Sequence, residues 1–278
     1  MKKLYMKSIK KEMSHFYNSS NSYLQILHSR RENFFKGYLR FISQHIASLN
    51  KNNKLKILEL GCGDGYSTCM IAKAFPSAEV LGTDISKKFI KYAKSNFKLK
   101  NLDYKVEDST RLSFKDSRFD IITSQDVIEH VPDIESFLKE SDRVLKKQGL
   151  IIIISPNVIS PITPLIDLFL LRTRVAYTLR IQDNIGLFFR NLNLSLKKLF
   201  SQKADFIYEQ PDLRNATQIG GDLDRVYLAN PIDLIKYFKN NQNYKIINVN
   251  NSTSLYQKIL SFFLKPFYSI GFVAKKIR

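Results

Sequence analysis

An apolar segment that runs into a turn of alternating glycines constrains this chain more than any other feature. Residues 57–60 read Ile-Leu-Glu-Leu, and the next five read Gly-Cys-Gly-Asp-Gly. A second apolar segment, residues 80–83, ends in Asp84, which follows Gly61 by 23 residues. This order of strand, glycine turn, helix and strand is typical of sites for adenosine-containing ligands. The glycines allow close backbone approach, and the closing carboxylate accepts hydrogen bonds from ribose hydroxyls.

The spacing of the glycines distinguishes between two classes of cofactor. A dinucleotide-binding turn needs a third glycine at position 66, where this chain has Tyr66. The turn instead resembles motif I of the class I S-adenosylmethionine-dependent methyltransferases. The resemblance implies that Glu59 faces the methionine end of S-adenosylmethionine and that Asp84 binds its ribose.

Further segments follow in the order of that family. Residues 102–106 are predicted as a third strand. The resemblance implies that Asp108, just beyond it, meets the adenine amino group while the backbone of Ser109 donates to the ring. Residues 119–126 and 150–157 are predicted as strands four and five, because continuous apolar runs suit a parallel sheet buried on both faces. The predicted cofactor-binding residues are Glu59, Gly61, Cys62, Gly63, Asp84, Ile85, Asp108, Ser109 and Gln125.

The whole pattern predicts an α/β fold, a Rossmann-like doubly wound sheet of seven strands with the last strand antiparallel. Asp133 is expected to cap a helix over residues 134–146, whose apolar side chains recur on one face. Residues 244–250 and 271–276 are expected to be strands six and seven. The predicted division is an N-terminal helical extension (1–50), a cofactor-binding core (51–157), a helical insertion after strand five (158–224) and a C-terminal completion of the core sheet (225–278).

Composition places few limits on the location of the chain. Its two cysteines, Cys62 and Cys69, lie in the turn and the following helix, which favours a reduced, cytoplasmic setting over a disulfide. The basic start lacks the apolar core of a signal peptide. The longest apolar region, residues 150–171, is too interrupted by proline and polar residues to predict a membrane span.

The formal net charge of +19 indicates nucleic acid or an anionic membrane as a partner. The lysines are nevertheless spread along the chain, and residues 124–127 read Ser-Gln-Asp-Val. Enzymes that methylate exocyclic base amines usually have Asn-Pro-Pro-Tyr or Asp-Pro-Pro-Tyr there, to hold a flipped base. Nucleic acid is therefore the weaker interpretation of the charge.

The N-terminal extension is expected to cover the core. Residues 34–49 carry apolar side chains at helical spacing, and residues 23–31 are expected to lie over the cofactor, as N-terminal helices do in this family. Arg30 and Arg31 either meet the cofactor carboxylate or are solvated.

The insertion is predicted to contain two amphipathic helices with basic polar faces. They form either a lid over the acceptor or a surface for an anionic bilayer. One apolar face comprises Leu165, Leu168, Phe169, Val175, Ala176 and Leu179, with Arg172, Arg174 and Arg180 elsewhere. The other comprises Phe188, Phe189, Leu192, Leu196, Leu199 and Phe200, opposed by Arg190, Lys197 and Lys198. An aromatic, cationic stretch at residues 255–268 extends the acceptor wall or the same surface, or packs in the core.

Three residues at the carboxyl end of strand four and just beyond it are the candidates for catalysis: Asp126, Glu129 and His130. Their pattern resembles the Glu-x-x-Glu-His of quinone-biosynthesis O-methyltransferases, where those positions are associated with magnesium. The shorter Asp126 puts that metal in doubt, so no metal ligand is predicted. His130 is either a general base toward a hydroxyl acceptor or a brace for the loop.

The sequence thus predicts an S-adenosylmethionine-dependent methyltransferase. Its acceptor is expected to be a small molecule or linked to a lipid or glycan, with methylation at oxygen favoured. It is expected to act in the cytoplasm, at the inner face of the membrane if the basic helices bind there. A non-catalytic S-adenosylmethionine-binding partner protein and a nucleic-acid methyltransferase are the alternatives.

Overall fold

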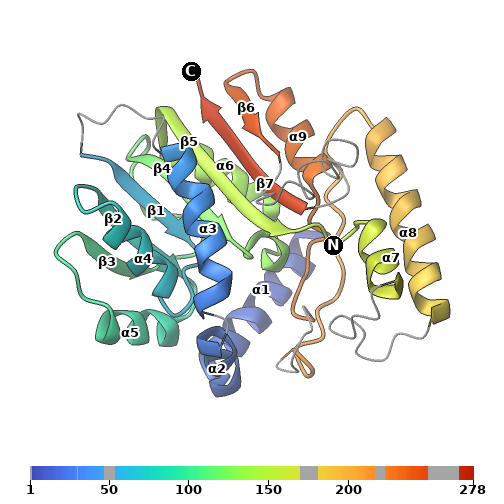
Figure 1. The fold of residues 1–278 in the computed structure, drawn as a ribbon, viewed down its shortest axis with the longest axis horizontal. Helices are drawn as coiled ribbons and strands as arrows, with labels where there is room; N and C mark the ends of the chain where they lie inside the picture. The colour runs from blue at the N-terminus through green and yellow to red at the C-terminus, as the bar shows by residue number, and fades with distance from the viewer. Residues whose placement is uncertain (1, 30, 47–53, 170–180, 217–222, 250–268) are drawn as a thin grey trace.

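The core of the protein is one mixed sheet of seven strands (Figure 1). The computed structural model describes residues 2–29, 31–46, 54–169, 181–216, 223–249 and 269–278. The strand order is β3-β2-β1-β4-β5-β7-β6, and β7 runs antiparallel to both of its neighbours. The predicted fold class is therefore confirmed. The strands are β1 Lys56–Leu60, β2 Glu79–Asp84, β3 Leu102–Val106, β4 Phe119–Gln125, β5 Leu145–Pro156, β6 Tyr244–Asn248 and β7 Ser269–Lys276.

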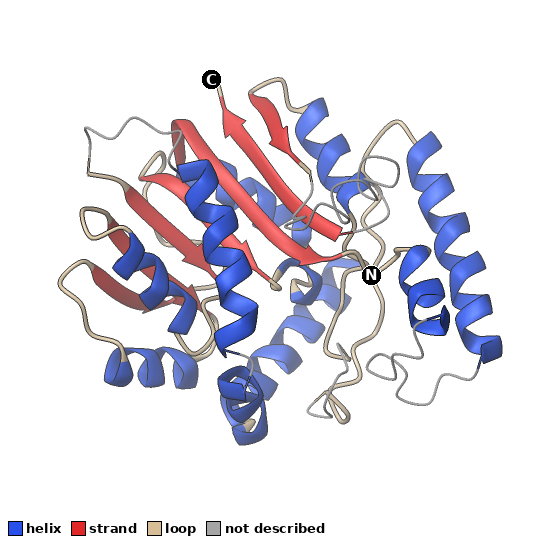
Figure 2. Ribbon diagram, viewed as in Figure 1, coloured by secondary structure: helices blue, strands red, loops and turns tan. Residues whose placement is uncertain are grey.

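Helices cover both faces of the sheet, as Figure 2 shows. Successive residues of a strand point to opposite faces, so β1 contributes to two cores. Ile57 packs with Ile42 on one face, whereas Leu58 packs with Ile134 and Phe137 on the other. The helices that flank the sheet are α3 Arg31–Ile46, α4 Tyr66–Ala74, α5 Lys87–Asn96, α6 Ile134–Val144 and α9 Pro231–Asn240.

Two N-terminal helices precede this sandwich. Helix α2, Asn21–Ser29, corresponds to the segment 23–31 that was expected to lie over the cofactor, and α1, Lys2–Ser19, falls within the predicted N-terminal helical extension, although no separate helix was delimited there. Helix α1 buries Ile9 and Met13 against Val226, far along the chain. So few apolar residues among many lysines give a weak helical pattern, and the partner that makes the helix favourable is distant in sequence.

The helix before β5 is shorter than predicted. Helix α6 ends at Val144, two residues before the expected end, because Leu145 already pairs with Phe119 as the first residue of β5. The predicted cap is present, since the Asp133 side chain accepts a hydrogen bond from the backbone of Ser136.

The insertion contains α7, Ile162–Phe169, and α8, Ile181–Phe200, with α8 at the outer edge of the molecule (Figure 1). One cation of α8 departs from the predicted pattern. Lys198, expected on a solvated face, is buried and ion-pairs with Asp233 at 2.7 Å, whereas Phe189 and Phe200 are 61% and 86% exposed. The helix presents polar groups inward because Asn191 and Ser195 donate to carbonyls of residues 159–160.

Several predicted features lie outside the described residues. These are Arg30, the stretch 170–180 with its three arginines, and the aromatic stretch 255–268. The side chain of Arg31 is likewise not described.

Candidate cofactor and acceptor site

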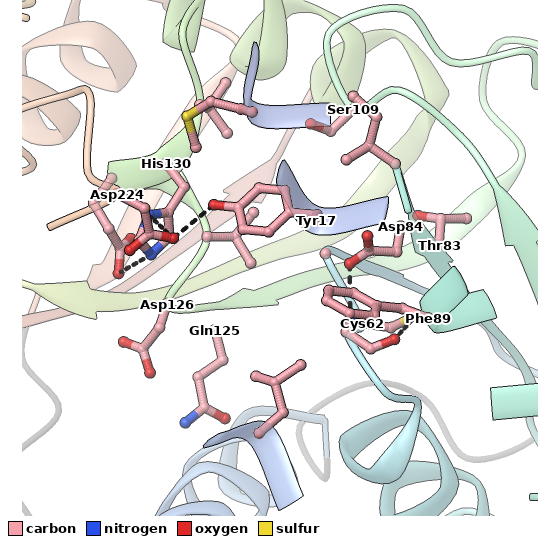
Figure 3. Close-up of a pocket in the computed structure, with 18 of the residues that line it drawn as sticks. Tyr17, Cys62, Thr83, Asp84, Phe89, Ser109, Gln125, Asp126, His130 and Asp224 are labelled. Carbon is pink, nitrogen blue, oxygen red and sulfur yellow. Dashed lines mark hydrogen bonds and ion pairs between the residues drawn. The ribbon is translucent and has the colours of Figure 1, made fainter. Parts of the chain in front are cut away.

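A cavity of about 630 Å³ opens at the carboxyl ends of β1, β2 and β4 (Figure 3). The strand order reverses between β1 and β4, and such switch points are where open α/β sheets bind ligands. All twelve residues predicted for the site line this cavity. They are Glu59, Gly61, Cys62, Gly63, Asp84, Ile85, Asp108, Ser109, Gln125, Asp126, Glu129 and His130.

The glycine turn closes one side of the cavity. Gly61 and Gly63 have φ values of 71° and 53°, which side chains other than glycine rarely adopt. A Cβ atom on Gly61 would lie 2.4 Å from a methyl group of Val127. Gly61 therefore also allows the loop after β4 to pack against the turn, a role that the sequence did not indicate. Cys62 holds the turn to β2 by donating its backbone N–H to Thr83 at 2.9 Å.

Glu59 is buried at the end of β1. It accepts hydrogen bonds from the Thr68 hydroxyl at 2.5 Å and the Tyr38 hydroxyl at 3.2 Å. Burial raises the pKa of Glu59 to about 7, although these hydrogen bonds favour the ionised form. A cationic group in the cavity would favour ionisation, since opposite charges stabilise each other most where water is excluded.

Asp84 is held in a fixed orientation at the end of β2. One carboxylate oxygen accepts from the Gly63 backbone at 3.0 Å, and the other accepts from the Ser86 backbone at 2.8 Å. The enclosing protein raises the pKa of Asp84 to about 6, against the effect of these hydrogen bonds. Each oxygen retains lone-pair capacity, so the carboxylate can accept two vicinal hydroxyls.

Asp108 has a partner that the sequence did not reveal. Its carboxylate accepts from the Thr110 backbone at 3.0 Å and forms an ion pair with Lys10 of α1. Lys10 also donates to the Thr110 hydroxyl at 2.7 Å. The first helix thus reaches over the part of the cavity that was predicted to receive adenine.

The end of β4 brings Gln125 and Asp126 to the cavity, where Figure 3 shows them apart from the group around His130. Asp126 has a φ of 48°, an uncommon conformation for this residue type, and donates its backbone N–H to Ile154 at 2.9 Å. A non-glycine residue in this region is a reason to suspect a functional constraint.

His130 ends the short 3₁₀ helix η1, Ile128–His130, and lies beside three other functional groups. Its Nδ1 is 3.4 Å from a carboxylate oxygen of Asp224, and its Nε2 is 3.9 Å from Glu129. The same oxygen of Asp224 accepts from the Tyr17 hydroxyl at 2.8 Å. Neither Asp224 nor Tyr17 was singled out from the sequence, because they lie 94 residues after and 113 residues before His130.

The lining is acidic although the protein is basic. Among the described lining residues Lys10 is the lysine, and no arginine is present. The acidic residues of the lining are Glu59, Asp64, Asp84, Glu107, Asp108, Asp126, Glu129 and Asp224. Such a lining fits S-adenosylmethionine, which carries a sulfonium and an ammonium group.

Two features are absent from the described part of the chain. There, no group of three or more His, Cys, Asp or Glu side chains is arranged to hold a metal ion. None of the helices in the same residues is long and apolar enough to cross a bilayer.

Comparison with known proteins agrees with the site. Residues 58–153 match a family of methyltransferase domains. Over 134 residues the chain is 36% identical to a ubiquinone biosynthesis O-methyltransferase of Pelagibacter ubique, covering 45% of this chain and 55% of that protein. Over 94 residues it is 33% identical to a ubiquinone/menaquinone biosynthesis C-methyltransferase of Desulfotalea psychrophila, covering 34% and 38% respectively. The chain thus spans about half the length, or less, of these relatives.

The fold has a counterpart among solved structures. An S-adenosylmethionine-dependent methyltransferase from Mesorhizobium loti superposes with a TM-score of 0.52 at 14% identity, covering 87% of this chain and all of that one. The matched domain, the strand order and the acidic cavity lead to the same conclusion. This chain carries a class I S-adenosylmethionine-dependent methyltransferase domain, and S-adenosylmethionine is its cofactor.

Proposed function

We propose that this protein transfers the methyl group of S-adenosylmethionine to an oxygen atom of a small-molecule acceptor or of one linked to a lipid or glycan. The observation that carries the proposal is that one cavity joins two sets of residues. Glu59, Asp84 and Asp108 line it toward β1, β2 and β3, while His130 and Asp224 line it beyond β4. A bound cofactor and an acceptor can therefore meet in the same enclosed space.

Three residues of the chain would have separate roles in the reaction. The bound cofactor supplies an electrophilic methyl group on its sulfonium. Asp84 would accept the ribose hydroxyls of the bound cofactor, and Glu59 would attract its ammonium group. Holding the acceptor in line can lower the barrier by about 7–11 kcal/mol. His130 removes the proton of an acceptor hydroxyl as the new bond forms, which contributes roughly 10²–10⁴-fold.

Oxygen is favoured over carbon because of the base. A hydroxyl must lose its proton on methylation, and a largely enclosed imidazole beside a buried carboxylate suits that task. The printed names of the relatives include both an O-methyltransferase and a C-methyltransferase of quinone biosynthesis. Both support an acceptor of that general kind, a ring system that bears hydroxyl groups.

The acidic cavity argues against a nucleic-acid acceptor. A polynucleotide backbone would bring phosphates toward Asp126, Glu129 and Asp224, which repel anions. The cationic side chains behind the net charge of +19 therefore lie mostly outside the cavity. A non-catalytic role as a cofactor-binding partner would leave the His130 group without a task.

The test of the proposal is methyl transfer from cofactor labelled on its methyl group. The acceptors are simple catechols, such as 3,4-dihydroxybenzoate, and a bacterial lipid extract. Ether cleavage of the labelled product then releases the label from O-methyl but not from C-methyl groups. His130→Gln should lower transfer by at least tenfold and leave cofactor affinity within twofold, whereas His15→Gln, on the exposed side of α1, should change neither.

Absence of transfer to every acceptor, with intact cofactor binding, would favour the non-catalytic alternative. Activity is expected to survive dialysis against EDTA, because no metal is predicted to take part. Loss of activity that magnesium restores would revive the magnesium alternative.

We further propose that α8 brings the protein to an anionic bilayer. Its outer side carries an exposed apolar stripe beside the exposed Arg190 and Lys197. An apolar stripe flanked by cations suits the interface of an anionic membrane, which adds about 1 kcal/mol for each nearby cation. The stripe consists of Ile185, Phe189, Leu196, Leu199 and Phe200.

Sedimentation with vesicles tests this contact. The protein should sediment with phosphatidylglycerol-containing vesicles at low salt and much less with phosphatidylcholine vesicles. Exchange of Arg190, Lys197 and Lys203 for glutamine should reduce sedimentation, whereas glutamine at Lys87, Lys91 and Lys94 of α5 should not. If the wild type ignores anionic vesicles, the exposed stripe of α8 does not mediate membrane contact.

A further inference from the structure

Backbone hydrogen bonds hold the segment that carries Asp224 against the segment that carries His130. The backbone carbonyl of Glu129 accepts hydrogen bonds from the N–H groups of Val226 at 2.7 Å and Tyr227 at 2.9 Å. These bonds fix the segment after the insertion against η1, so that Asp224, only 2% exposed, faces the imidazole. A buried carboxylate within 3.4 Å of Nδ1 is placed to determine which ring nitrogen carries the proton.

Tyr17 supplies the other contact of Asp224 and comes from α1. Its backbone carbonyl accepts from the Ser86 hydroxyl at 3.1 Å, and its ring packs edge-on against Tyr23. Burial, reinforced by the negative charge of Asp224, raises the pKa of Tyr17 well above its usual value. The phenol therefore keeps its proton and donates to Asp224.

We propose that Asp224 and Tyr17 are positioning residues of the methyl-transfer site and that His130 is the group they position. Tyr17 orients Asp224, and Asp224 holds the proton of His130 on Nδ1, which leaves Nε2 to accept a proton. This inference rests on the proposed function and deepens it. It requires an acceptor that carries a hydroxyl group, and it makes Tyr17 of helix α1 a part of the active site (Figure 3).

The proposed step requires the cofactor, an acceptor hydroxyl group and His130 as the base. The acceptor O–H bond breaks and its proton goes to Nε2 of His130. The electron pair of that oxygen forms the new bond to the methyl carbon, and the pair of the breaking S–CH₃ bond stays on sulfur. The imidazolium that results is stabilised by Asp224 on one side and by the Glu129 carboxylate, 3.9 Å from Nε2, on the other. Asp126 is the further ionisable group that lines this end of the cavity.

The direct test does not require an acceptor. The chain has four histidines, so His130 can be identified in long-range ¹H–¹⁵N spectra by its absence in His130→Gln. In the wild type we expect Nδ1 to carry the proton in the neutral ring. Asp224→Asn should lower the His130 pKa by about one unit and change the tautomer, because a neutral amide replaces the carboxylate. Asp212→Asn, on an exposed part of the same segment, should leave both unchanged.

Tyr17→Phe should change the His130 pKa in the opposite direction. Without the phenol, the full charge of Asp224 acts on the imidazole, and the His130 pKa should rise by a few tenths of a unit. The matched control is Tyr5→Phe on the same helix, since Tyr5 is exposed and donates to Gln210. Unchanged His130 spectra in Tyr17→Phe would remove Tyr17 from the group.

Kinetics then separate this inference from the proposed function. With a catechol acceptor, Asp224→Asn should lower kcat roughly 10²-fold with little change in KM. The acidic limb of its pH–rate profile should move to lower pH, because the His130 pKa falls. Unaltered tautomer and pKa in Asp224→Asn would overturn the inference even if methyl transfer proceeds. Altered spectra in a protein that transfers to no acceptor would instead overturn the proposed function.

Discussion

The cofactor half of the cavity and helix α8 differ in how faithfully they follow their sequence patterns. At the ends of β1 and β2, Glu59 and Asp84 lie where the motif predicts them. In α8 the amphipathic pattern is present, but Lys198 is buried while Phe189 and Phe200 are exposed. The motif fixes its geometry through short-range backbone constraints, namely glycine turns with positive φ and strand ends one helix apart. An apolar stripe on a helix predicts only which side chains share a face, and not whether that face is buried.

What decides the orientation of α8 is a polar cluster made by distant segments. Lys198 and Asp233 are each 1% exposed, and Tyr227 and Asn230 donate to the same carboxylate oxygen of Asp233 at 2.9 and 2.7 Å. A buried charge is tolerated when it is paired and hydrogen-bonded, so this cluster outweighs the gain from burying the apolar stripe. The four predictions below test how far that difference extends.

The largest effect is expected for Lys198→Ala. Removal of the ammonium group leaves Asp233 as an uncompensated buried charge, which destabilises proteins by about 3–5 kcal/mol. Urea unfolding at neutral pH measures the change. Lys197→Ala, one residue earlier and exposed, should stay within about 0.5 kcal/mol. Equal effects of the two substitutions would mean that α8 does not bury its polar side.

The next effect concerns the motif itself. Asp84→Ala removes a charged acceptor for two ribose hydroxyls, each worth about 1.5–3 kcal/mol, so S-adenosylmethionine should bind more than a hundredfold more weakly. Calorimetry with S-adenosylhomocysteine gives the same comparison without turnover. Asp103→Ala, an exposed residue of β3, is the control and should bind normally. Unchanged affinity in Asp84→Ala would contradict the ribose assignment.

A smaller effect is expected from pH. The pKa of Glu59 is about 7 in the free protein, and only the ionised carboxylate attracts the cofactor ammonium group. Affinity for S-adenosylmethionine should therefore fall as the pH decreases from 7.5 to 6, by up to about tenfold. Glu59→Gln should bind more weakly at pH 7.5 and show a shallower profile over that range, because Asp84, whose pKa is about 6, begins to take up a proton only near its lower end. A pH-independent wild type would place the cofactor ammonium group away from Glu59.

The smallest effect is expected for Phe189→Ser and Phe200→Ser. Both rings are already exposed, so the free energy of unfolding should change by less than about 0.5 kcal/mol. The same variants should lose sedimentation with anionic vesicles. A large loss of stability in either variant would show that the stripe is covered in the folded protein, and the contrast with the core would disappear.

Much of the site was predictable because it lies in contiguous motifs. Glu59, the three residues of the glycine turn and Asp84 follow one another within a single strand–helix–strand unit. Gln125 ends β4, and Asp126, Glu129 and His130 follow within the next five residues. Parallel strands bring their carboxyl ends to one edge, so all these side chains reach one cavity once the fold class is known.

Other parts of the site depend on packing between distant segments. Lys10 and Tyr17 belong to a helix whose apolar residues Ile9 and Met13 find their partner at Val226. The place of Asp224 follows from two hydrogen bonds to the carbonyl of Glu129, which no spacing in the sequence announces.

The sequence by itself determined the sheet, the cofactor and the residues that are predicted to hold it. The strand and turn conformations behind these features depend on residues that are neighbours along the chain. Only the tertiary structure decided that α1 and Asp224 surround His130 and that α8 turns its polar side inward. Such choices depend on which buried charges and donors find partners, and those partners come together only when segments about 35 to 200 residues apart have packed.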